Sequence, residues 1–384
     1  MDTISLLTGI YYTMIYLDNA ATSRFKPKCV IDALLSDVKN SANSGRSGHK
    51  ASIATTLAVE SARNYFKEAF EIDNVIFTKS CTEALNLGIF GFVKDGMTVV
   101  TTENEHNSVL RPLYELKRRG VINLVIVPVE AGFYPFDELI RCGKQADLIV
   151  VSNISNVLGA SLDVEGLKKS LKDYPVKIFV DGAQGVPYMP ISGRWADMIA
   201  LPAHKGLHGI QGVGALLLSN DIHLKPLIYG GTGTESFSVS QPITMPEGFE
   251  AGTLFSGGIR GFHQGAIWSY EHINEIRQHV KKMAEECAYG LKTLGVNVYN
   301  NEFISGIVTF NIKDVDSQYI ASYLDQRNIA VRGGLHCAPL LHKRLGTDHQ
   351  GAVRVSFGVD NNEKDNLMLL SSVEKHLIRM KRNI

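Results

Sequence analysis

The stretch KIFVDGAQ, residues Lys177–Gln184, passes directly from a short apolar run into an acid and a glycine. The run predicts a buried strand over 177–180, because strands covered on both faces are apolar throughout. Similar runs alternate with helical patterns along much of the chain. This alternation predicts the α/β class, with a mostly parallel sheet covered by helices on both faces. The other predicted strands are 75–78, 98–101, 124–129, 148–151, 198–201 and 214–218, and the helices between them are 82–92, 109–119 and 164–172.

The chain divides into two predicted domains, because its 384 residues suffice for a large domain and a smaller one. The first strand-like run begins at about residue 15, so we expect residues 1–13 to be a disordered or upstream extension. Residues 14–260 form the predicted large domain, whose first residues are also placed to pack on the small one. Residues 261–384 form the predicted small α+β domain, which begins with one long helix over 261–294.

The charge and the cysteine content exclude several classes of protein. Lys plus Arg and Asp plus Glu both number 39, so the formal net charge is zero. This balance removes the general attraction that nucleic acid or an anionic membrane surface requires. No run of about 18 apolar residues is present to span a bilayer. The five cysteines are scattered without a CxxC pair, which favours a reducing compartment. We therefore expect a cytoplasmic protein that binds neither nucleic acid nor membrane.

Three polar groups follow predicted strands, where ligands of open α/β sheets bind. Taken singly, Asp181 is most simply a helix N-cap and Lys205 is equally a surface charge. Residues 80–82 (SCT) open a helix, which suits a phosphate held by backbone N–H groups. In combination they predict a pyridoxal-phosphate enzyme. That cofactor requires a lysine for its aldehyde, an acid for its pyridine nitrogen and donors for its phosphate.

Eight motifs in one order carry a resemblance over nearly the whole chain, from about Tyr16 to the C-terminus. The chain resembles the cysteine desulfurase and selenocysteine lyase family of the class V aminotransferase fold, in its Suf-like group. The resemblance implies the PLP-dependent transferase fold type I, with a seven-stranded-type sheet in the large domain and a smaller α+β C-terminal domain. The motifs are YLDNAAT (16–22), TEALN (82–86), EHNS (105–108), SNVLG (155–159), VDGAQ (180–184), HK (204–205), RGGLHCAP (332–339) and VRVS (353–356).

The resemblance assigns one set of residues to the cofactor, pyridoxal 5′-phosphate. Lys205 corresponds to the lysine that forms the Schiff base and later moves a proton. Asp181 corresponds to the acid beside the pyridine nitrogen, and Gln184 to the hydrogen-bond donor for the phenolic oxygen. His106 would stack on the ring and take part in catalysis. The phosphate end would be contacted by Cys81, Thr82, His204 and, from a neighbouring subunit, Thr253. This last contact implies a homodimer with shared active sites.

A second set of residues is assigned to the substrate, L-cysteine or L-selenocysteine. Cys337 corresponds to the thiol that attacks the substrate sulfur, which leaves a persulfide on the enzyme and L-alanine as product. His336 and Arg332 lie near it in a Gly-rich loop, a setting that favours the thiolate. The loop is short, which implies that sulfur passes to a docked acceptor protein. The substrate would be held by Ala21, Asn156, Arg332 and Arg354.

The chain also departs from the family pattern. Pro202 stands where relatives commonly have a phosphate-binding serine, and Leu335 stands where Suf-type enzymes often have a second histidine. Two alternatives to a cysteine desulfurase stay open: a selenocysteine lyase that releases selenide, and a catalytically idle scaffold with the same fold. A zinc site is disfavoured, because adjacent ligands have poor geometry and no CxxC pair is present. Its ligands would be His336, Cys337, His342 and His349.

Overall fold

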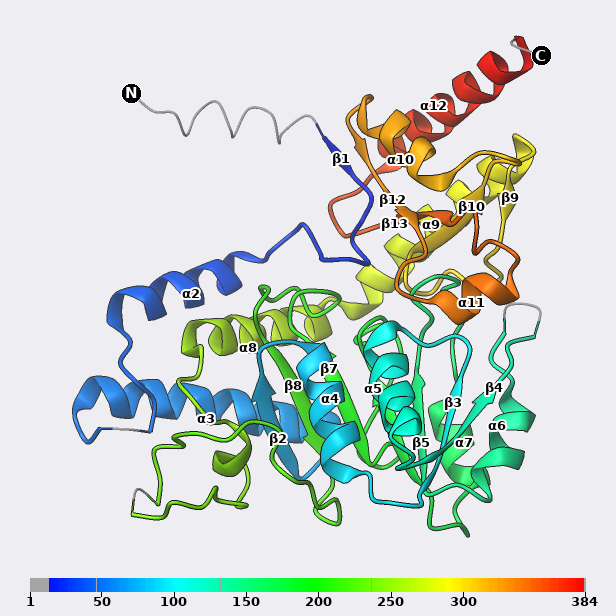
Figure 1. Cartoon of the computed structure of the whole chain (residues 1–384). Coiled ribbons are helices and arrows are strands. Elements are labelled where there is room, and N and C mark those ends of the chain that lie inside the picture. Colours follow the sequence, from blue (N-terminus) through cyan, green and yellow to red (C-terminus); the bar gives the residue numbers. More distant parts are fainter. Residues whose placement is uncertain (1–13, 46, 131–132, 236, 383–384) are drawn as a thin grey trace.

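The structure is a computed structural model that describes residues 14–45, 47–130, 133–235 and 237–382 (Figure 1), so the predicted extension 1–13 lies outside the described residues. Its centre is a seven-stranded sheet in the order β2-β8-β7-β6-β5-β3-β4. The strands from β7 to β4 in this order are parallel, whereas β8 is antiparallel to both of its neighbours. The predicted α/β class and mostly parallel sheet are confirmed. The strands are β2 (Asn74–Thr78), β3 (Thr98–Thr102), β4 (Asn123–Val127), β5 (Leu148–Ser152), β6 (Lys177–Asp181), β7 (Met198–Pro202) and β8 (Gly214–Leu218).

Helices cover both faces of this sheet. On one face, α4 (Cys81–Phe92) and α5 (Asn107–Arg118) pack against alternate strand residues, among them Phe179 of β6. The neighbouring residues Ile178 and Val180 point to the other face and join a separate core. Residues 28–70, for which the sequence predicted no element, form two of the helices on that side. The helices there are α2 (Lys28–Asn40), α3 (Lys50–Phe70), α6 (Phe136–Gly143), α7 (Val164–Ser170) and α8 (Ser256–Glu271).

The remaining elements form a smaller α+β unit at the top of Figure 1. Its antiparallel sheet has the order β12-β13-β10-β9 and shares one core with α9, α10 and α12. The N-terminal strand β1 (Ile15–Tyr16) pairs in parallel with β11 (Ile329–Ala330), so the start of the described chain lies against this unit. The other elements are α9 (Ile273–Thr293), β9 (Asn297–Val298), β10 (Ile307–Asn311), α10 (Ser317–Asp325), β12 (Arg332–Gly334), α11 (Pro339–Arg344), β13 (Ala352–Ser356) and α12 (Glu363–Arg382).

The prediction of one long helix over 261–294 is wrong, because the chain breaks at His272 into α8 and α9. The His272 ring lies on the Trp268 ring, and its Nδ1 donates a hydrogen bond to the Trp268 carbonyl at 2.8 Å. A side chain that bonds the carbonyl four residues earlier competes with the helical pattern and bends the chain. The predicted domain boundary at 260/261 therefore falls inside α8, which packs against α2 and α3.

The parallel strands bring their carboxyl ends to one edge of the large sheet, below the small unit (Figure 1). In this register Ser152 of β5 lies beside Asp181 of β6, and Asp181 lies beside Ala200 of β7. The polar residues that follow these strands are therefore neighbours in space, as strand-end residues of one parallel sheet must be. Within the described part of the chain, no helix is long and apolar enough to cross a membrane.

Candidate active site

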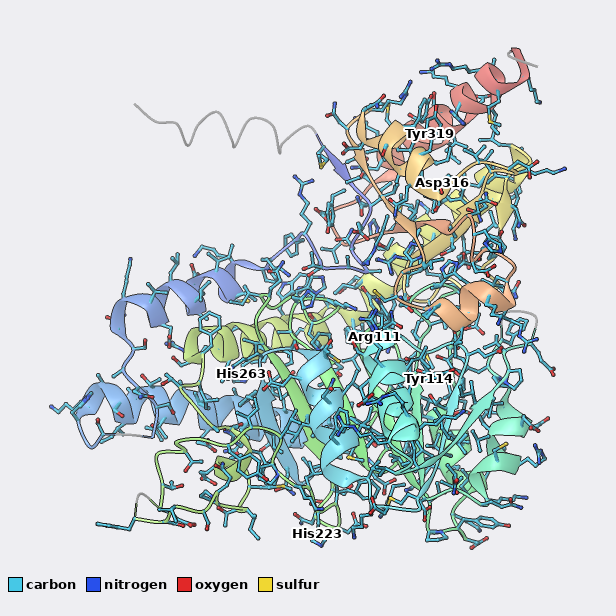
Figure 2. All side chains as sticks on the ribbon, in the orientation of Figure 1. Arg111, Tyr114, His223, His263, Asp316 and Tyr319 are labelled. Carbon is cyan, nitrogen blue, oxygen red and sulfur yellow. The ribbon has the colours of Figure 1, made fainter. Side chains whose placement is uncertain are left out.

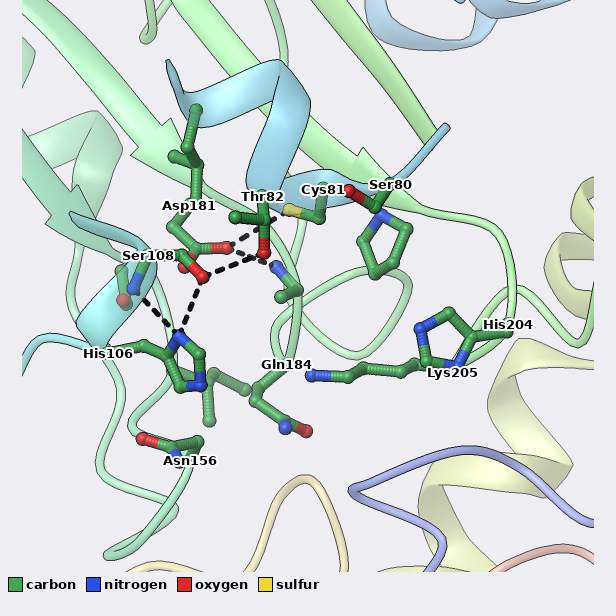
Figure 3. A pocket seen from close by; sticks show the side chains of 15 residues that line it. Ser80, Cys81, Thr82, His106, Ser108, Asn156, Asp181, Gln184, His204 and Lys205 are labelled. Carbon is green, nitrogen blue, oxygen red and sulfur yellow. Dashed lines mark hydrogen bonds between the residues drawn. The ribbon is translucent and has the colours of Figure 1, made fainter. Parts of the chain in front are cut away.

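A cleft opens at this edge of the sheet, beyond the carboxyl ends of the parallel strands, where ligands of open α/β sheets bind. The structure brings most of the predicted site residues into its wall (Figure 3), from the ends of the five strands β2, β3, β5, β6 and β7. The predicted residues that line it are Cys81, Thr82, His106, Asn156, Asp181, Gln184, His204 and Lys205. Ser80, of the segment 80–82 predicted to hold a phosphate, also lines it, as do Ser108 and Ser152, for which the sequence predicted no role in a site.

Asp181 ends β6 at the floor of the cleft and is only 3% exposed. Its Oδ1 accepts hydrogen bonds from the Ala183 N–H at 2.9 Å and from the Cys81 thiol at 3.6 Å. Burial raises the pKa of Asp181, and both of these partners are neutral groups. A carboxylate buried without a hydrogen-bonded cation is stabilised by a positively charged ligand group placed against it.

Lys205 follows β7 and extends into the cleft toward Gln184 (Figure 3). Burial lowers the pKa of Lys205, while the nearby Asp181 acts in the opposite direction. A lysine with a lowered pKa has a larger fraction of its amine in the neutral, nucleophilic form. Gln184 is fixed on the other side of the cleft, because its Nε2 donates to the Ala20 carbonyl at 2.8 Å.

The start of α4 forms one end of the cleft. Ser80 caps the helix by accepting the Glu83 N–H at 3.1 Å, and the hydroxyls of Thr82 and Ser108 are 2.8 Å apart. Gly214 of β8 allows the backbone of Ser80 to lie close to that strand, since a Cβ at position 214 would be 2.6 Å from the Ser80 carbonyl carbon. His204 Nδ1 is buried here without a hydrogen-bond partner in the described chain. A helix N-terminus with hydroxyls and an unpartnered imidazole is suited to an anion.

His106 is held in one tautomer at the start of α5. Its Nδ1 accepts the backbone N–H of Ser108 at 3.0 Å, so a neutral ring carries its proton on Nε2. Burial lowers the pKa of His106 to about 4, and the charge of Lys205 adds to this effect. The ring is therefore neutral near pH 7.

Cys337 lies in a tight loop between β12 and α11, docked against the large sheet. Its carbonyl accepts the Asn107 N–H at 2.7 Å, and the preceding His336 carbonyl accepts Asn156 Nδ2 at 2.7 Å. His336 and Cys337 have φ values of 49° and 57°, a left-handed conformation that non-glycine residues adopt rarely. Cys337 borders a groove that it shares with Thr82, His106 and Arg111.

Arg354 is almost wholly buried in β13, where it is 1% exposed. Its Nη2 pairs with Asp18 Oδ1 at 2.9 Å, and its Nη1 donates to the Asn156 carbonyl at 3.0 Å. The third guanidinium nitrogen, Nε, is buried without a partner in the described chain. No role was predicted for Asp18, although an acid directly after a strand was the same signal that singled out Asp181.

Five of the predicted residues do not line the cleft: Ala21, Thr253, Arg332, Cys337 and Arg354. Ala21 and Arg332 are half-buried beside it, and the charge of Arg332 contributes to the lowered pKa of His106. Thr253 lines a separate pocket with Phe77 and Glu83. Its predicted contact with a neighbouring subunit stays a prediction. No group of three or more residues able to hold a metal ion occurs among the residues that the structure describes.

These observations fit pyridoxal phosphate. Asp181 has a buried carboxylate for a pyridinium nitrogen, and Lys205 has an amine for an aldehyde. The start of α4 offers backbone donors for a phosphate, and His204, whose Nδ1 has no partner in the described chain, lines the same cleft. Pro202 in place of a serine removes one side-chain donor, but it leaves these donors in place.

Comparison with known proteins shows the family and the fold of the chain. The family model described as "Aminotransferase class-V" matches residues 15–368. A protein of Pyrococcus abyssi named "Probable cysteine desulfurase" is 34% identical over 94% of both chains. A protein of the same name from Methanothermobacter thermautotrophicus is 32% identical, also over 94% of both. The apo structure of the cysteine desulfurase from Thermococcus onnurineus is 30% identical over 98% of both chains, with a TM-score of 0.89. A cysteine desulfurase structure from Escherichia coli, 24% identical with a TM-score of 0.84, has the same fold.

Proposed function

The chain belongs to the aminotransferase class-V family, whose members depend on pyridoxal phosphate, and we propose that it is a cysteine desulfurase, as its relatives at 30–34% identity are named. The reaction converts L-cysteine to L-alanine and leaves the sulfur as a persulfide on Cys337. One observation carries the proposal: Cys337, in its docked loop, borders the same groove as His106 and Thr82 of the cleft. A transaminase has no use for a thiol at that place.

In this proposal the cleft residues hold the cofactor as the resemblance implies. Lys205 binds its aldehyde, Asp181 pairs with its ring nitrogen, and Gln184 contacts its phenolic oxygen. His106 covers the ring face, and the start of α4 with Thr82 and His204 holds the phosphate, with Cys81 packed beside Asp181. When bound, the cofactor supplies an electron sink that stabilises negative charge at the substrate Cα.

The substrate carboxylate is bound by Arg354, which has one buried guanidinium nitrogen free of other partners in the described chain. Asn156, Arg332 and Ala21 complete this end of the site in our proposal. Lys205 takes the proton from the substrate Cα, because burial lowers its pKa and favours the neutral amine.

The sulfur step balances without a further reactant. The Cys337 thiolate forms a bond to the substrate sulfur, the bond between that sulfur and Cβ breaks, and its electron pair stays with Cβ. Two protons from the site groups complete the product, so L-cysteine and the enzyme thiol give L-alanine and the enzyme persulfide. The outer sulfur of the persulfide is then passed to the thiol of an acceptor protein, which leaves Cys337 as a thiol again.

We also propose a homodimer with shared sites. Thr253 lies outside the cleft of its own chain, as a residue that serves the cleft of a second copy must. Analytical ultracentrifugation is expected to show a dimer, and Thr253→Ala is expected to weaken cofactor binding. A monomeric protein with full cofactor content would contradict this part of the proposal.

The direct test incubates the cofactor-loaded protein with L-cysteine and a thiol reductant, and measures sulfide and alanine in equal amounts. Cys337→Ala is expected to reduce sulfide release by about 10³-fold or more, as for loss of an essential nucleophile. Cys142→Ala, at a half-buried cysteine on α6, is the matched control and should keep full activity.

Two results would reject the proposal. No sulfide from the unaltered protein, together with no visible absorbance from lysine-bound cofactor, would favour the idle scaffold. Selenide release from selenocysteine that persists in Cys337→Ala would favour the selenocysteine lyase.

A further inference from the structure

Two buried histidines lie beneath the Cys337 loop, outside the residues assigned to the reaction. His336 and His342 are 3% and 0% exposed, and their rings are stacked with centroids 5.6 Å apart. The sequence had suggested them as disfavoured zinc ligands, but each ring is engaged in hydrogen bonds. His336 Nδ1 and His342 Nε2 are 3.4 Å apart, His336 Nε2 is 3.2 Å from the Arg332 carbonyl, and His342 Nδ1 is 2.8 Å from the Thr347 hydroxyl.

The chemistry of these atoms fixes the direction of every hydrogen bond. A carbonyl only accepts, so His336 Nε2 must carry a proton and donate to Arg332. Burial, with the charge of Arg354, lowers the pKa of His336, so the ring is neutral and its Nδ1 has a lone pair. His342 Nε2 must then donate to that lone pair. His342 is also neutral, since burial lowers its pKa to about 4, so its Nδ1 has a lone pair and accepts the Thr347 O–H at 2.8 Å. The His342 carbonyl also faces this hydroxyl, but at 3.3 Å it is the more distant acceptor.

The result is a one-way chain of donors, Thr347 to His342 to His336 to the Arg332 carbonyl. It ends on the strand that leads into the Cys337 loop. From the opposite side, Asn107 and Asn156 donate to the carbonyls of Cys337 and His336. The left-handed backbone of residues 336 and 337 is thus fixed by side-chain and backbone donors on both sides. Such a conformation persists only where its surroundings determine it.

We propose that His342 and Thr347 are positioning residues that act through His336 to hold the Cys337 thiol at the substrate. The inference rests on the proposed function for the identity of the step that it serves. Neither residue touches the cleft: Thr347 lies in the loop after α11, and His342 lies within that helix.

The matched variants are Thr347→Val and Thr347→Ser. Valine has nearly the same shape as threonine but removes the O–H, which leaves the buried His342 Nδ1 without a donor. Serine keeps the O–H and is expected to restore the chain. We expect Thr347→Val to lower kcat for alanine formation about ten-fold with KM changed less than about two-fold, because a small displacement of a reacting group lowers the rate without weakening binding. Thr347→Ser is expected to stay near the unaltered rate.

A second measurement does not depend on activity. Alkylation of Cys337 by iodoacetamide, followed by peptide mass spectrometry with Cys142 as internal reference, reports the position of the loop directly. We expect alkylation of Cys337 about three-fold faster in Thr347→Val, as a loop freed of one constraint opens more often, and no change in Thr347→Ser. Equal rates and equal kcat in all three proteins would overturn the inference.

The tautomers provide a test on the unaltered protein, even if Thr347→Val fails to fold. Nitrogen chemical shifts of histidine-labelled protein should show His336 and His342 both neutral with the proton on Nε2. A proton on Nδ1 of either ring, or a charged ring at pH 7, would reject the chain. If the unaltered protein forms no alanine but has these tautomers and alkylation rates, the proposed function fails while the positioning of Cys337 stands.

Discussion

At the scale of the residue, the burial of Arg354 has a direct consequence for stability. Its guanidinium is 1% exposed, and Asp18 is the one carboxylate paired with it in the described chain. Removing one partner of a buried ion pair leaves an uncompensated charge, which is more destabilising than losing the pair altogether. The pairing of two residues 336 positions apart thus fixes both the arginine and the start of the chain.

We expect Asp18→Asn to lower the free energy of unfolding by about 3 kcal/mol, because it leaves the Arg354 charge unpaired. Asparagine keeps the shape of the side chain, so packing is unchanged. Urea denaturation followed by circular dichroism measures the effect. Asp32→Asn, at an exposed ion pair with Lys28, is the control and should change the value by less than about 1 kcal/mol. If the two substitutions lowered the free energy of unfolding equally, the buried ion pair would contribute no more to stability than the exposed one.

The Asp18–Arg354 pair also shows the limit of what a sequence can predict. Asp181 and Lys205 could be found because each follows an apolar strand, and a strand is a local pattern. The partner of Arg354 could not, because no local pattern joins positions so far apart. The donor chain through His342 and Thr347 is equally invisible, since its direction follows from burial and from the carbonyl of Arg332.

At the scale of the element, α4 determines the geometry of the proposed phosphate site. Gly88 lies where this helix crosses β6, and a Cβ there would meet the ring of Phe179. We expect Gly88→Ala to destabilise the protein by about 1–2 kcal/mol, because overpacking outweighs the better helix propensity of alanine. It should also weaken binding of pyridoxal phosphate, since the start of α4 would move.

Thermal unfolding and cofactor titration measure the two effects of Gly88→Ala. Gly48→Ala is the matched control, because a Cβ at Gly48 meets nothing within 4 Å. It should change the free energy of unfolding by less than about 0.5 kcal/mol. If Gly88→Ala changed neither the free energy of unfolding nor cofactor binding, α4 would be able to shift on the sheet without cost.

Strands were predicted more reliably than helices. All seven strands of the large sheet were predicted from short apolar runs, because the apolar composition of a buried strand is visible in five residues. The break at His272 was missed, since neither glycine nor proline marks it and its cause is a side chain bonded to the Trp268 carbonyl. Helices α2 and α3 were also missed. Their outer faces carry exposed apolar residues such as Leu35 and Leu57, which blur the amphipathic pattern.

At the scale of the whole molecule, several buried histidines make stability depend on pH. Burial lowers the pKa of His106, His204, His208 and His342 to about 4, against about 6.5 in an unfolded chain. Between these values the unfolded chain binds protons that the folded chain does not, so the free energy of unfolding falls as pH falls. Three buried carboxyl groups oppose this trend, because burial raises the pKa of Glu105 to about 7 and also raises the pKa of Asp181 and of Glu250.

The histidines with a lowered pKa outnumber these carboxyl groups, since burial also lowers the pKa of His263, His336 and His376. We therefore expect the cofactor-free protein to lose stability from pH 7 to pH 5. Each such histidine contributes a slope of at most roughly 1.4 kcal/mol per pH unit. Urea denaturation at pH 7, 6 and 5 measures the change in the free energy of unfolding. In Glu105→Gln one of the opposing carboxyl groups is absent, so this free energy should fall more steeply as pH falls. A midpoint that is constant or rises toward pH 5 would show that buried carboxyl groups dominate instead.

The N-terminal segment has a consequence for how the chain can be cut or joined. Tyr16 belongs to a strand pair with the small unit, Ala20 accepts from Gln184, and the Ser23 N–H donates to the His204 carbonyl. Residues 16–23 therefore make contacts with the small unit and with the large unit at the same time. Removing them would not shorten a free terminus. The shortened chain would lose both the carboxylate that pairs with Arg354 and the backbone hydrogen bond to His204, the residue before Lys205.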